Sequence, residues 1–263
     1  LAKIIKEKKI DFVISDCRYG CWSDLVPSIF ITHQVNLLMP PLLKWLGPLV
    51  NFFNRFQIKK FTRCWVPDFP KDRVTGKLSE SRGMIVNYIG MLSRFNPSIV
   101  TDRPKKYEVL AILSGPEPQR SKFEDILKNQ LLLFGKPSLL VRGLPRGDAK
   151  RAIHAQLEIV NYLSSNELQV AIEESRMLIS RSGYSSVMDF TRLGGRVIFV
   201  PTPGQTEQEY LAEQLETEGI AFYQRQKEFD LSIALTNSAK YTGFTNHDFS
   251  SELLNKAIDD LLK

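Results

Sequence analysis

Residues of the types that bind a diphosphate and a sugar lie together between Ile179 and Gln208. Gly183 permits a tight turn, and the residues after it are predicted to begin a helix. The free N–H groups and partial positive charge of a helix N-terminus favour a phosphate. Asp189 lies four residues beyond Ser185, where its carboxylate could accept both hydroxyls of a ribose. This spacing indicates a site for a nucleotide sugar.

A structural role explains part of the same pattern. Ser185 and Ser186 are suited to cap a helix, and Asp189 to complement its dipole. The next loop favours a ligand, because the amide and carboxylate groups in its sequence PTPGQTEQ can bond sugar hydroxyls. A capping box of Thr206 and Glu209 would leave the PTPGQ run unexplained. Both interpretations stay open at this point.

A third loop, from Ser114 to Arg120, follows the first predicted strand of the second half of the chain. It lacks the GxGxxG pattern, and its two prolines remove N–H donors. Arg120 could neutralise a phosphate, although a solvated arginine at a helix start has the same appearance. The predicted donor-binding residues of the three loops are Ser114, Gly115, Arg120, Ser182, Gly183, Tyr184, Ser185, Ser186, Asp189, Gln205, Thr206, Glu207 and Gln208.

Predicted strands and helices alternate along most of the chain. Short runs of β-branched and aromatic residues, typical of buried strands, are separated by segments of helical periodicity. The predicted strands are 10–16, 27–33, 63–68, 84–92, 107–115, 137–143, 176–180, 196–201 and 219–223, and the predicted helices after them include 121–133, 166–174, 185–193 and 206–218. This order indicates the α/β class, with right-handed crossovers and doubly wound parallel sheets.

A segment rich in Pro, Arg and Lys separates two groups of elements. We expect an incomplete Rossmann-like domain at 1–92, a linker at 93–106, a second Rossmann-like domain at 107–247 and an amphipathic helix at 248–263. Ligands of such sheets bind beyond the carboxyl ends of the strands. The three loops follow predicted strands of the second domain, which is therefore predicted to hold the nucleotide sugar.

Two segments of the second domain resemble a known family. ISRSGYSSVMD (179–189) and FVPTPGQTEQEYLAEQL (199–215) are similar to the C-terminal, donor-binding domain of glycosyltransferase family 28, which includes the lipid-linked N-acetylglucosaminyltransferase of peptidoglycan synthesis. The resemblance implies a GT-B fold of two Rossmann-like domains facing a cleft. It also implies inverting transfer from a UDP-sugar, with no metal and no other cofactor.

The resemblance assigns roles to individual residues. It implies that Tyr184, Ser185 and Ser186 meet the diphosphate and uracil, that Asp189 binds the ribose, and that Gln208 holds the donor sugar. The asparagine that the family pattern has four residues later is replaced by alanine at position 212, so the identity of the sugar stays open.

The first domain carries the candidates for the chemistry on the acceptor. Asp16 and His33 lie at the ends of predicted strands, and His33 could serve as general base or phosphate contact. A histidine bonded to a backbone carbonyl would look the same. The chain begins at Leu1, this domain has room for only about four strands, and the glycine-rich acceptor loop of the family is absent. We expect that the start of the domain is missing.

The stretch from Leu37 to Phe61 is rich in large apolar residues and contains four cations, Lys44, Arg55, Lys59 and Lys60. Prolines and charges exclude a spanning helix, but an apolar face with basic flanks can rest in a bilayer interface. Such a face would bring the enzyme to the membrane surface, where a lipid-linked acceptor lies. The alternative is that the stretch packs into the core of the first domain.

Charge and cysteine content narrow the class of protein. Residues 1–106 carry 18 Lys and Arg against 8 Asp and Glu, a net charge of +10, while the remainder carries 17 against 21. We expect these basic runs to be solvated surface, with no nucleic acid as partner. The chain has three cysteines, an odd number, and Cys17 and Cys21 lack a second Cys/His pair that would complete a zinc site. A cytoplasmic protein, peripheral on the inner face of the plasma membrane, is the expected setting.

These observations predict a hexosyltransferase that moves a hexose or N-acetylhexosamine from a UDP-sugar to a hydroxyl of a lipid-linked or other envelope acceptor. A nucleotide-sugar epimerase or hydrolase of the same fold would need its own acid/base pair. A non-catalytic protein that binds sugar nucleotides is the third hypothesis. Binding without turnover would favour that third hypothesis.

Overall fold

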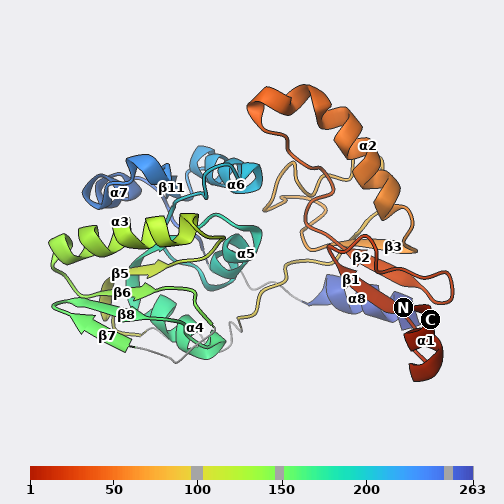
Figure 1. The fold of residues 1–263 in the computed structure, drawn as a ribbon, viewed down its shortest axis with the longest axis horizontal. Helices are drawn as coiled ribbons and strands as arrows, with labels where there is room; N and C mark the ends of the chain where they lie inside the picture. Colours follow the sequence, from red (N-terminus) through yellow and green to blue (C-terminus); the bar gives the residue numbers. More distant parts are fainter. Residues whose placement is uncertain (96–102, 146–150, 246–250, 263) are drawn as a thin grey trace. The chain divides into compact units, whose positions relative to one another are not determined.

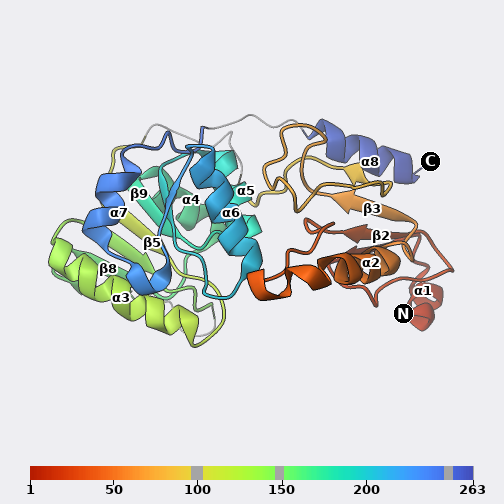
Figure 2. The same ribbon diagram turned by 90° about the horizontal axis from the view of Figure 1, so that it is seen from above.

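A computed structural model describes residues 1–95, 103–145, 151–245 and 251–262. The chain forms two compact units, one of Leu1–Leu92 with Phe249–Lys263 and one of Ser93–Asp248 (Figures 1 and 2). The C-terminal helix, expected as a separate segment at 248–263, is thus grouped with the first unit. The expected linker at 93–106 is grouped with the second unit, and its residues 96–102 lie outside the described residues.

The first unit is built on a parallel sheet whose strands follow chain order. Its elements are α1 (Ala2–Lys8), β1 (Val13–Asp16), β2 (Ser28–Ile31), the 3₁₀ helix η1 (Pro41–Leu46), α2 (Gly47–Ile58), β3 (Arg63–Val66), β4 (Asn87–Tyr88) and α8 (Glu252–Leu262). The strand order is β1-β2-β3-β4, and every neighbouring pair is parallel.

Both faces of this sheet are covered, because successive side chains of a strand point to opposite faces. Phe30 and Cys64 pack on one face with Ile58 at the end of α2. Ile29 and Trp65 pack on the other face with α8. Figure 1 shows α2 and α8 on opposite sides of these strands. Burial on both sides explains why β2 and β3 were recognisable as short apolar runs.

The second unit contains a larger sheet. Its elements are β5 (Tyr107–Ile112), α3 (Gln119–Phe134), β6 (Ser138–Val141), β7 (Arg151–His154), β8 (Leu157–Val160), α4 (Ser165–Glu173), β9 (Ser175–Ser180), α5 (Tyr184–Leu193), β10 (Val197–Phe199), α6 (Thr206–Thr217), β11 (Phe222–Tyr223), the 3₁₀ helix η3 (Gln226–Glu228) and α7 (Leu231–Ser238). The strand order is β11-β10-β9-β5-β6-β8-β7, with β7 antiparallel to β8 and the other pairs parallel.

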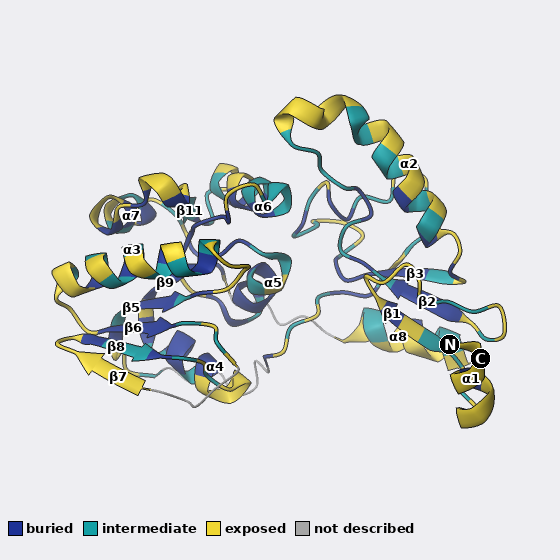
Figure 3. Ribbon diagram, in the orientation of Figure 1, coloured by how far each residue is buried: buried dark blue, intermediate teal, exposed yellow. Residues whose placement is uncertain are grey.

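Helices cover both faces of this sheet as well. Val109 and Ala111 of β5 belong to a buried cluster with Phe123 of α3 and with residues of α7. On the other face, the ring of Phe190 in α5 lies 6.1 Å from that of Phe199 in β10. Figure 3 shows the central strands buried between these helices. The expected doubly wound α/β arrangement is confirmed for this unit.

The strand order reverses between β5 and β9. From β5 the chain adds β6 and then β8 on one side, whereas β9 pairs with β5 on its other side and is followed outward by β10 and β11. The loops that leave the carboxyl ends of β5 and β9 therefore depart toward opposite faces of the sheet. In open α/β sheets this point forms a crevice and is the usual place of a ligand.

Candidate functional site

The loops that follow β5, β9 and β10 lie against one another at the carboxyl edge of the second sheet. Gly115, in the loop after β5, has φ +98°, and a Cβ there would lie 3.3 Å from Thr202 Oγ1 in the loop after β10. A Cβ on Gly183, after β9, would lie 3.9 Å from Gln208 Nε2. Gly115 thus allows the close approach of the loops after β5 and β10, while the loop after β9 lies at ordinary contact distance from Gln208.

The hydroxyl of Thr202 is an unsatisfied polar group at the centre of these loops. Thr202 is 2% exposed, and its Oγ1 has no hydrogen-bond partner among the described residues. A buried hydroxyl without a partner is unfavourable by about 1–3 kcal/mol. Such an atom next to Gly115 is suited to bond an oxygen of a ligand.

Helix α5 begins in this region, shortly after the end of β9. Its N-cap is Gly183, which makes no side-chain capping bond. The alternative that Ser185 and Ser186 cap the helix is therefore wrong, because both lie inside its first turn. The first N–H groups of a helix have no acceptor within the helix and, together with the helix dipole, favour an anion, as the diphosphate hypothesis requires.

Asp189 is buried one turn into α5, at 5% exposure. Its Oδ1 accepts a hydrogen bond of 2.7 Å from Ser93 Oγ, and its Oδ2 one of 3.0 Å from Arg94 Nε. Burial raises the pKa of this carboxyl, while the bonds from Ser93 and Arg94 oppose the rise. Each carboxylate oxygen can accept a further bond. The predicted ribose contact must share Asp189 with these two donors or displace them.

Gln208 connects the loops after β9 and β10. Its Oε1 accepts from the backbone N–H of Thr202 at 2.8 Å, and its Nε2 donates to Gln205 Oε1 at 2.7 Å. Its backbone oxygen accepts from Ser182 Oγ at 2.7 Å. The predicted sugar-binding glutamine therefore already fixes the loop around it. One hydrogen of its amide nitrogen remains to reach a ligand.

The start of α6 differs from the capping alternative of the sequence analysis. The N-cap is Gln205, without a side-chain cap, and the helix begins at Thr206. Glu209 Oε1 instead accepts from the backbone N–H of Gly204 at 3.2 Å. The capping box of Thr206 and Glu209 is therefore not formed, and Gln205, Thr206 and Glu207 are placed where the loop after β10 meets the helix.

Arg120 lies in the first turn of α3, where its charge is already neutralised. Its Nε donates to Glu117 at 2.7 Å and its Nη1 to Glu124 at 2.6 Å. The side chain is 8% exposed. A phosphate contact by Arg120 would have to compete with these two carboxylates, whereas Ser114 and Gly115 are exposed beside it.

The predicted site did not include Arg181, although it directly follows β9. Its side chain is buried at this edge and donates to Val200 O at 2.8 Å. Its only signal in the sequence is a charged residue placed immediately after an apolar strand.

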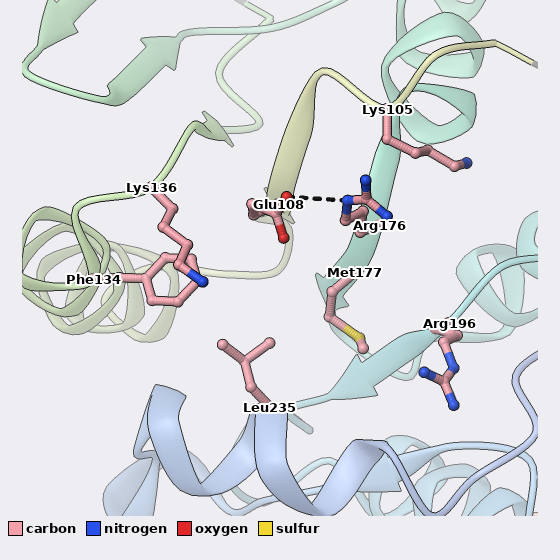
Figure 4. A pocket seen from close by; sticks show the side chains of 8 residues that line it. All are labelled: Lys105, Glu108, Phe134, Lys136, Arg176, Met177, Arg196 and Leu235. Atoms are coloured by element: carbon pink, nitrogen blue, oxygen red, sulfur yellow. Dashed lines mark hydrogen bonds and ion pairs between the residues drawn. The ribbon is translucent and has the colours of Figure 1, made fainter.

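A pocket of about 470 Å³ lies at the opposite, amino edge of the same sheet. Figure 4 shows its lining, which comprises Lys105, Glu108, Phe134, Lys136, Arg176, Met177, Arg196 and Leu235. Lys105 Nζ donates to the backbone oxygen of Glu173 at the end of α4, and Arg196 Nη2 to that of Ala239 at the end of α7. Cations at helix C-termini complement the helix dipole. This role accounts for Lys105 and Arg196, while Arg176 pairs with Glu108 and Lys136 lies over the ring of Phe134.

The predicted catalytic residues Asp16 and His33 lie at the carboxyl edge of the first sheet. Asp16 ends β1, where it is exposed and opposite Ile31 of β2. His33 follows β2 by two residues and is half-buried, with Gln34 Nε2 3.5 Å from its Nε2. Both positions suit an acceptor-side role, which stays a prediction.

The segment from η1 to α2 turns its polar side inward. Asn54 is 4% exposed and donates to Val35 O at 3.0 Å, while Asn51 Oδ1 accepts from Leu37 N at 2.8 Å. The outward side consists of Leu42, Leu43, Trp45, Leu49, Phe52, Phe53 and Phe56, exposed by 41–90%. We name these seven residues the α2 apolar surface, and Figure 3 shows that much of the α2 ribbon is exposed. The core alternative holds for Ile58 and Phe61, which pack with β2 and β3, but not for these seven side chains, which face outward.

Comparison with known proteins agrees with the geometry. Residues 144–242 match the glycosyltransferase family 28 C-terminal domain. The matched residues lie within the second unit. The matched range begins after β6 and includes the loops that follow β9 and β10, together with α5 and α6.

Two archaeal relatives extend the similarity to most of the chain. An uncharacterized glycosyltransferase of Methanosarcina mazei is 26% identical over 234 residues, and one of Methanosarcina acetivorans is 24% identical over 237. The matches cover 82% and 83% of this chain and 61% of each relative. The chain thus spans less than two thirds of the length of these relatives.

Solved glycosyltransferase structures share the fold. The kitacinnamycin glycotransferase matches with a TM-score of 0.58 at 16% identity, covering 98% of this chain and 73% of that one. The spinosyn rhamnosyltransferase SpnG complexed with thymidine diphosphate matches with a TM-score of 0.58 at 11% identity, covering 99% and 72%. The chain has the GT-B fold, as the resemblance implied. Within the described residues, no helix has the length and apolar character needed to span a membrane.

Proposed function

We propose that the chain belongs to a glycosyltransferase that moves a hexose or N-acetylhexosamine from a UDP-sugar to an acceptor hydroxyl. The observation that carries the proposal is the convergence of the loops after β5, β9 and β10 at the point where the strand order reverses. This edge offers an uncapped helix start and the unsatisfied hydroxyl of Thr202. A nucleoside diphosphate needs donors of this kind.

The proposed roles follow from the positions of the groups. The start of α5 faces the diphosphate with Tyr184, Ser185 and Ser186, and its dipole stabilises the charge that develops on the leaving UDP. Asp189 accepts the ribose hydroxyls. The segment 205–208, at the start of α6, bonds the donor sugar. The dipole of α5 contributes positive potential at this edge, and the proposal assigns no metal or other cofactor.

On the acceptor side, we assign proton removal to His33, with Asp16 nearby in the sheet. Attack by the acceptor oxygen on the anomeric carbon breaks the bond to UDP and inverts the configuration at that carbon. The solved structure of SpnG, which shares the fold, is complexed with thymidine diphosphate, a nucleoside diphosphate of the class proposed here.

For the acceptor we propose a lipid-linked molecule of the cell envelope, reached from the cytoplasmic face of the membrane. The α2 apolar surface supports this, because a helix that buries Asn54 and exposes Phe52 at 65% is matched to an apolar surrounding. Lys44 and Lys59 lie on the same segment, and cations of this kind attract anionic lipids. The protein would then rest on the inner leaflet as a peripheral protein.

Titration with UDP, UDP-glucose, UDP-galactose and UDP-N-acetylglucosamine tests the donor assignment. Release of UDP is then measured with and without lipid acceptors. The proposal predicts binding, with release that depends on an acceptor. Conversion of the UDP-sugar without an acceptor would indicate the epimerase or hydrolase, and binding without any conversion the non-catalytic protein. Absence of binding to all four nucleotides contradicts the proposal.

Sedimentation with lipid vesicles tests the membrane assignment. The protein is expected to sediment with phosphatidylglycerol vesicles and much less with phosphatidylcholine vesicles at low salt, because the cations contribute about 1 kcal/mol each near an anionic surface. If the fraction of protein in the pellet is the same with and without vesicles for both lipids, the membrane assignment is contradicted.

A further inference from the structure

Arg181 holds together the segments at the carboxyl edge of the second sheet. Its Nη1 donates to Val200 O at 2.8 Å and to Pro201 O at 3.2 Å, at the end of β10. Its Nη2 donates to Gln226 Oε1 at 2.7 Å in η3 and to Gln119 O at 3.3 Å at the start of α3. One side chain thus connects β9, β10, α3 and η3.

The charge of Arg181 is not neutralised inside the unit. The residue is 1% exposed, all four of these acceptors are neutral, and it forms no ion pair with a carboxylate of the described residues. Its guanidinium carbon lies 4.5 Å from the ring centroid of Phe123, and its Nε has no hydrogen-bond partner among the described residues.

A buried cation without a counter-charge is unfavourable by itself. Burial lowers the pKa of Arg181 to about 10, so the group still carries its charge at neutral pH. Arg120 makes a useful contrast, because it lies at the same edge and is paired with Glu117 and Glu124. The uncompensated charge of Arg181 therefore contributes positive potential to the loops that surround it.

We propose that Arg181 is a positioning residue of the nucleoside diphosphate site, which fixes the loops around it and supplies the positive potential that the diphosphate neutralises. The proposal rests on the proposed function, because it assigns a role within the same site. It makes a distinctive claim: loss of the charge must weaken ligands in proportion to their negative charge. A merely structural role would weaken charged and uncharged ligands alike.

The test compares Arg181→Met and Arg181→Lys with the unchanged protein, using UDP, UMP, uridine and inorganic pyrophosphate in calorimetric titrations. For Arg181→Met we expect a loss of about tenfold or more for UDP and of about threefold or less for uridine, as for a lost charge interaction at an effective dielectric constant near 20. Arg181→Lys should keep the preference for UDP over uridine. Arg176→Met, an exposed arginine at the amino edge, is the control and should change neither affinity.

Equal losses for UDP and uridine in Arg181→Met would overturn the inference while leaving the proposed function intact. Pyrophosphate binding that depends on Arg181, in a protein that binds no UDP or UDP-sugar, would contradict the proposed function and, with it, the assignment of Arg181 to a nucleoside diphosphate site. Absence of binding to UDP and pyrophosphate alike would overturn both. If circular dichroism shows that Arg181→Met does not fold, Arg181→Lys decides: a ratio of UDP to uridine affinity within about threefold of the original supports the inference, and a larger fall overturns it.

Discussion

Replacing Phe52 and Phe56 together by glutamine should release the protein from lipid vesicles without unfolding it. Full burial of a phenylalanine side chain contributes about 2 kcal/mol. The two side chains are 65% and 54% exposed. Insertion of these exposed fractions into a bilayer interface would then contribute about 1.3 and 1.1 kcal/mol, together about 2.4 kcal/mol. That corresponds to about a 50-fold change in the partition constant.

The assay is sedimentation with phosphatidylglycerol vesicles over a range of lipid concentration, followed by thermal unfolding of the same samples without lipid. Because the two side chains are exposed, the change in unfolding free energy should stay within about 0.5 kcal/mol for each. Leu133→Gln is the matched control, since Leu133 is 88% exposed on α3 of the second unit. We expect it to leave vesicle binding unchanged.

Two results would refute this reasoning. Unchanged partitioning of the Phe52→Gln/Phe56→Gln variant would show that the α2 apolar surface does not enter the membrane. A fall in melting temperature of about 10 °C or more, in contrast to Leu133→Gln, would show that these side chains are packed in a core.

Three further outcomes concern the second unit. Asp189→Ala should lower the affinity for UDP by about tenfold, through loss of charge-assisted hydrogen bonds to the ribose, whereas Glu117→Ala should not; equal losses in calorimetry would count against the ribose assignment. Burial raises the pKa of Asp189, so its charged form is unfavourable in the folded protein. The unfolding free energy of Asp189→Asn minus that of the unchanged protein should therefore increase as pH rises through that pKa. If denaturant titrations give the same difference at every pH, this prediction is contradicted. Gly143→Ala should lower the unfolding free energy by about 2 kcal/mol or more, because φ is +70° and the Cβ would overlap the backbone oxygen of Leu113. Gly204→Ala, with φ +82° and open space around the Cβ, should lose only about 1 kcal/mol in thermal melts.

Most strands were predictable because burial on both faces leaves a simple pattern. β2, β5 and β9 are short runs of apolar residues between polar loops, and this pattern depends only on local sequence. The β7–β8 hairpin was missed for the opposite reason. Residues 151–154 are all exposed, and the turn uses Ala155 at φ +53° in place of a glycine or asparagine. The apolar run 84–92 was predicted as one strand, but only Asn87–Tyr88 pairs, with β3.

The loops of the candidate site were predictable as segments, and their contacts were not. Glycines and small residues after strands indicated where a phosphate could approach. The hydrogen bond from Ser93 to Asp189 joins residues 96 positions apart, and that from Arg181 to Gln226 joins residues 45 apart. Likewise, the inward polar side of α2 depends on Asn54 meeting the loop after β2. Such contacts depend on how distant segments pack in the tertiary fold, so local sequence does not predict them.

The central claim is that UDP binds at the carboxyl edge of the second sheet. Hydrogen–deuterium exchange with and without UDP tests it most directly, because different peptides report on the carboxyl edge and on the amino edge. The account predicts slower exchange in 113–117, 182–188 and 202–208 when UDP is added, with no change in 105–108, 134–137 and 195–197. Protection confined to the amino edge, or no protection at saturating UDP, would contradict it.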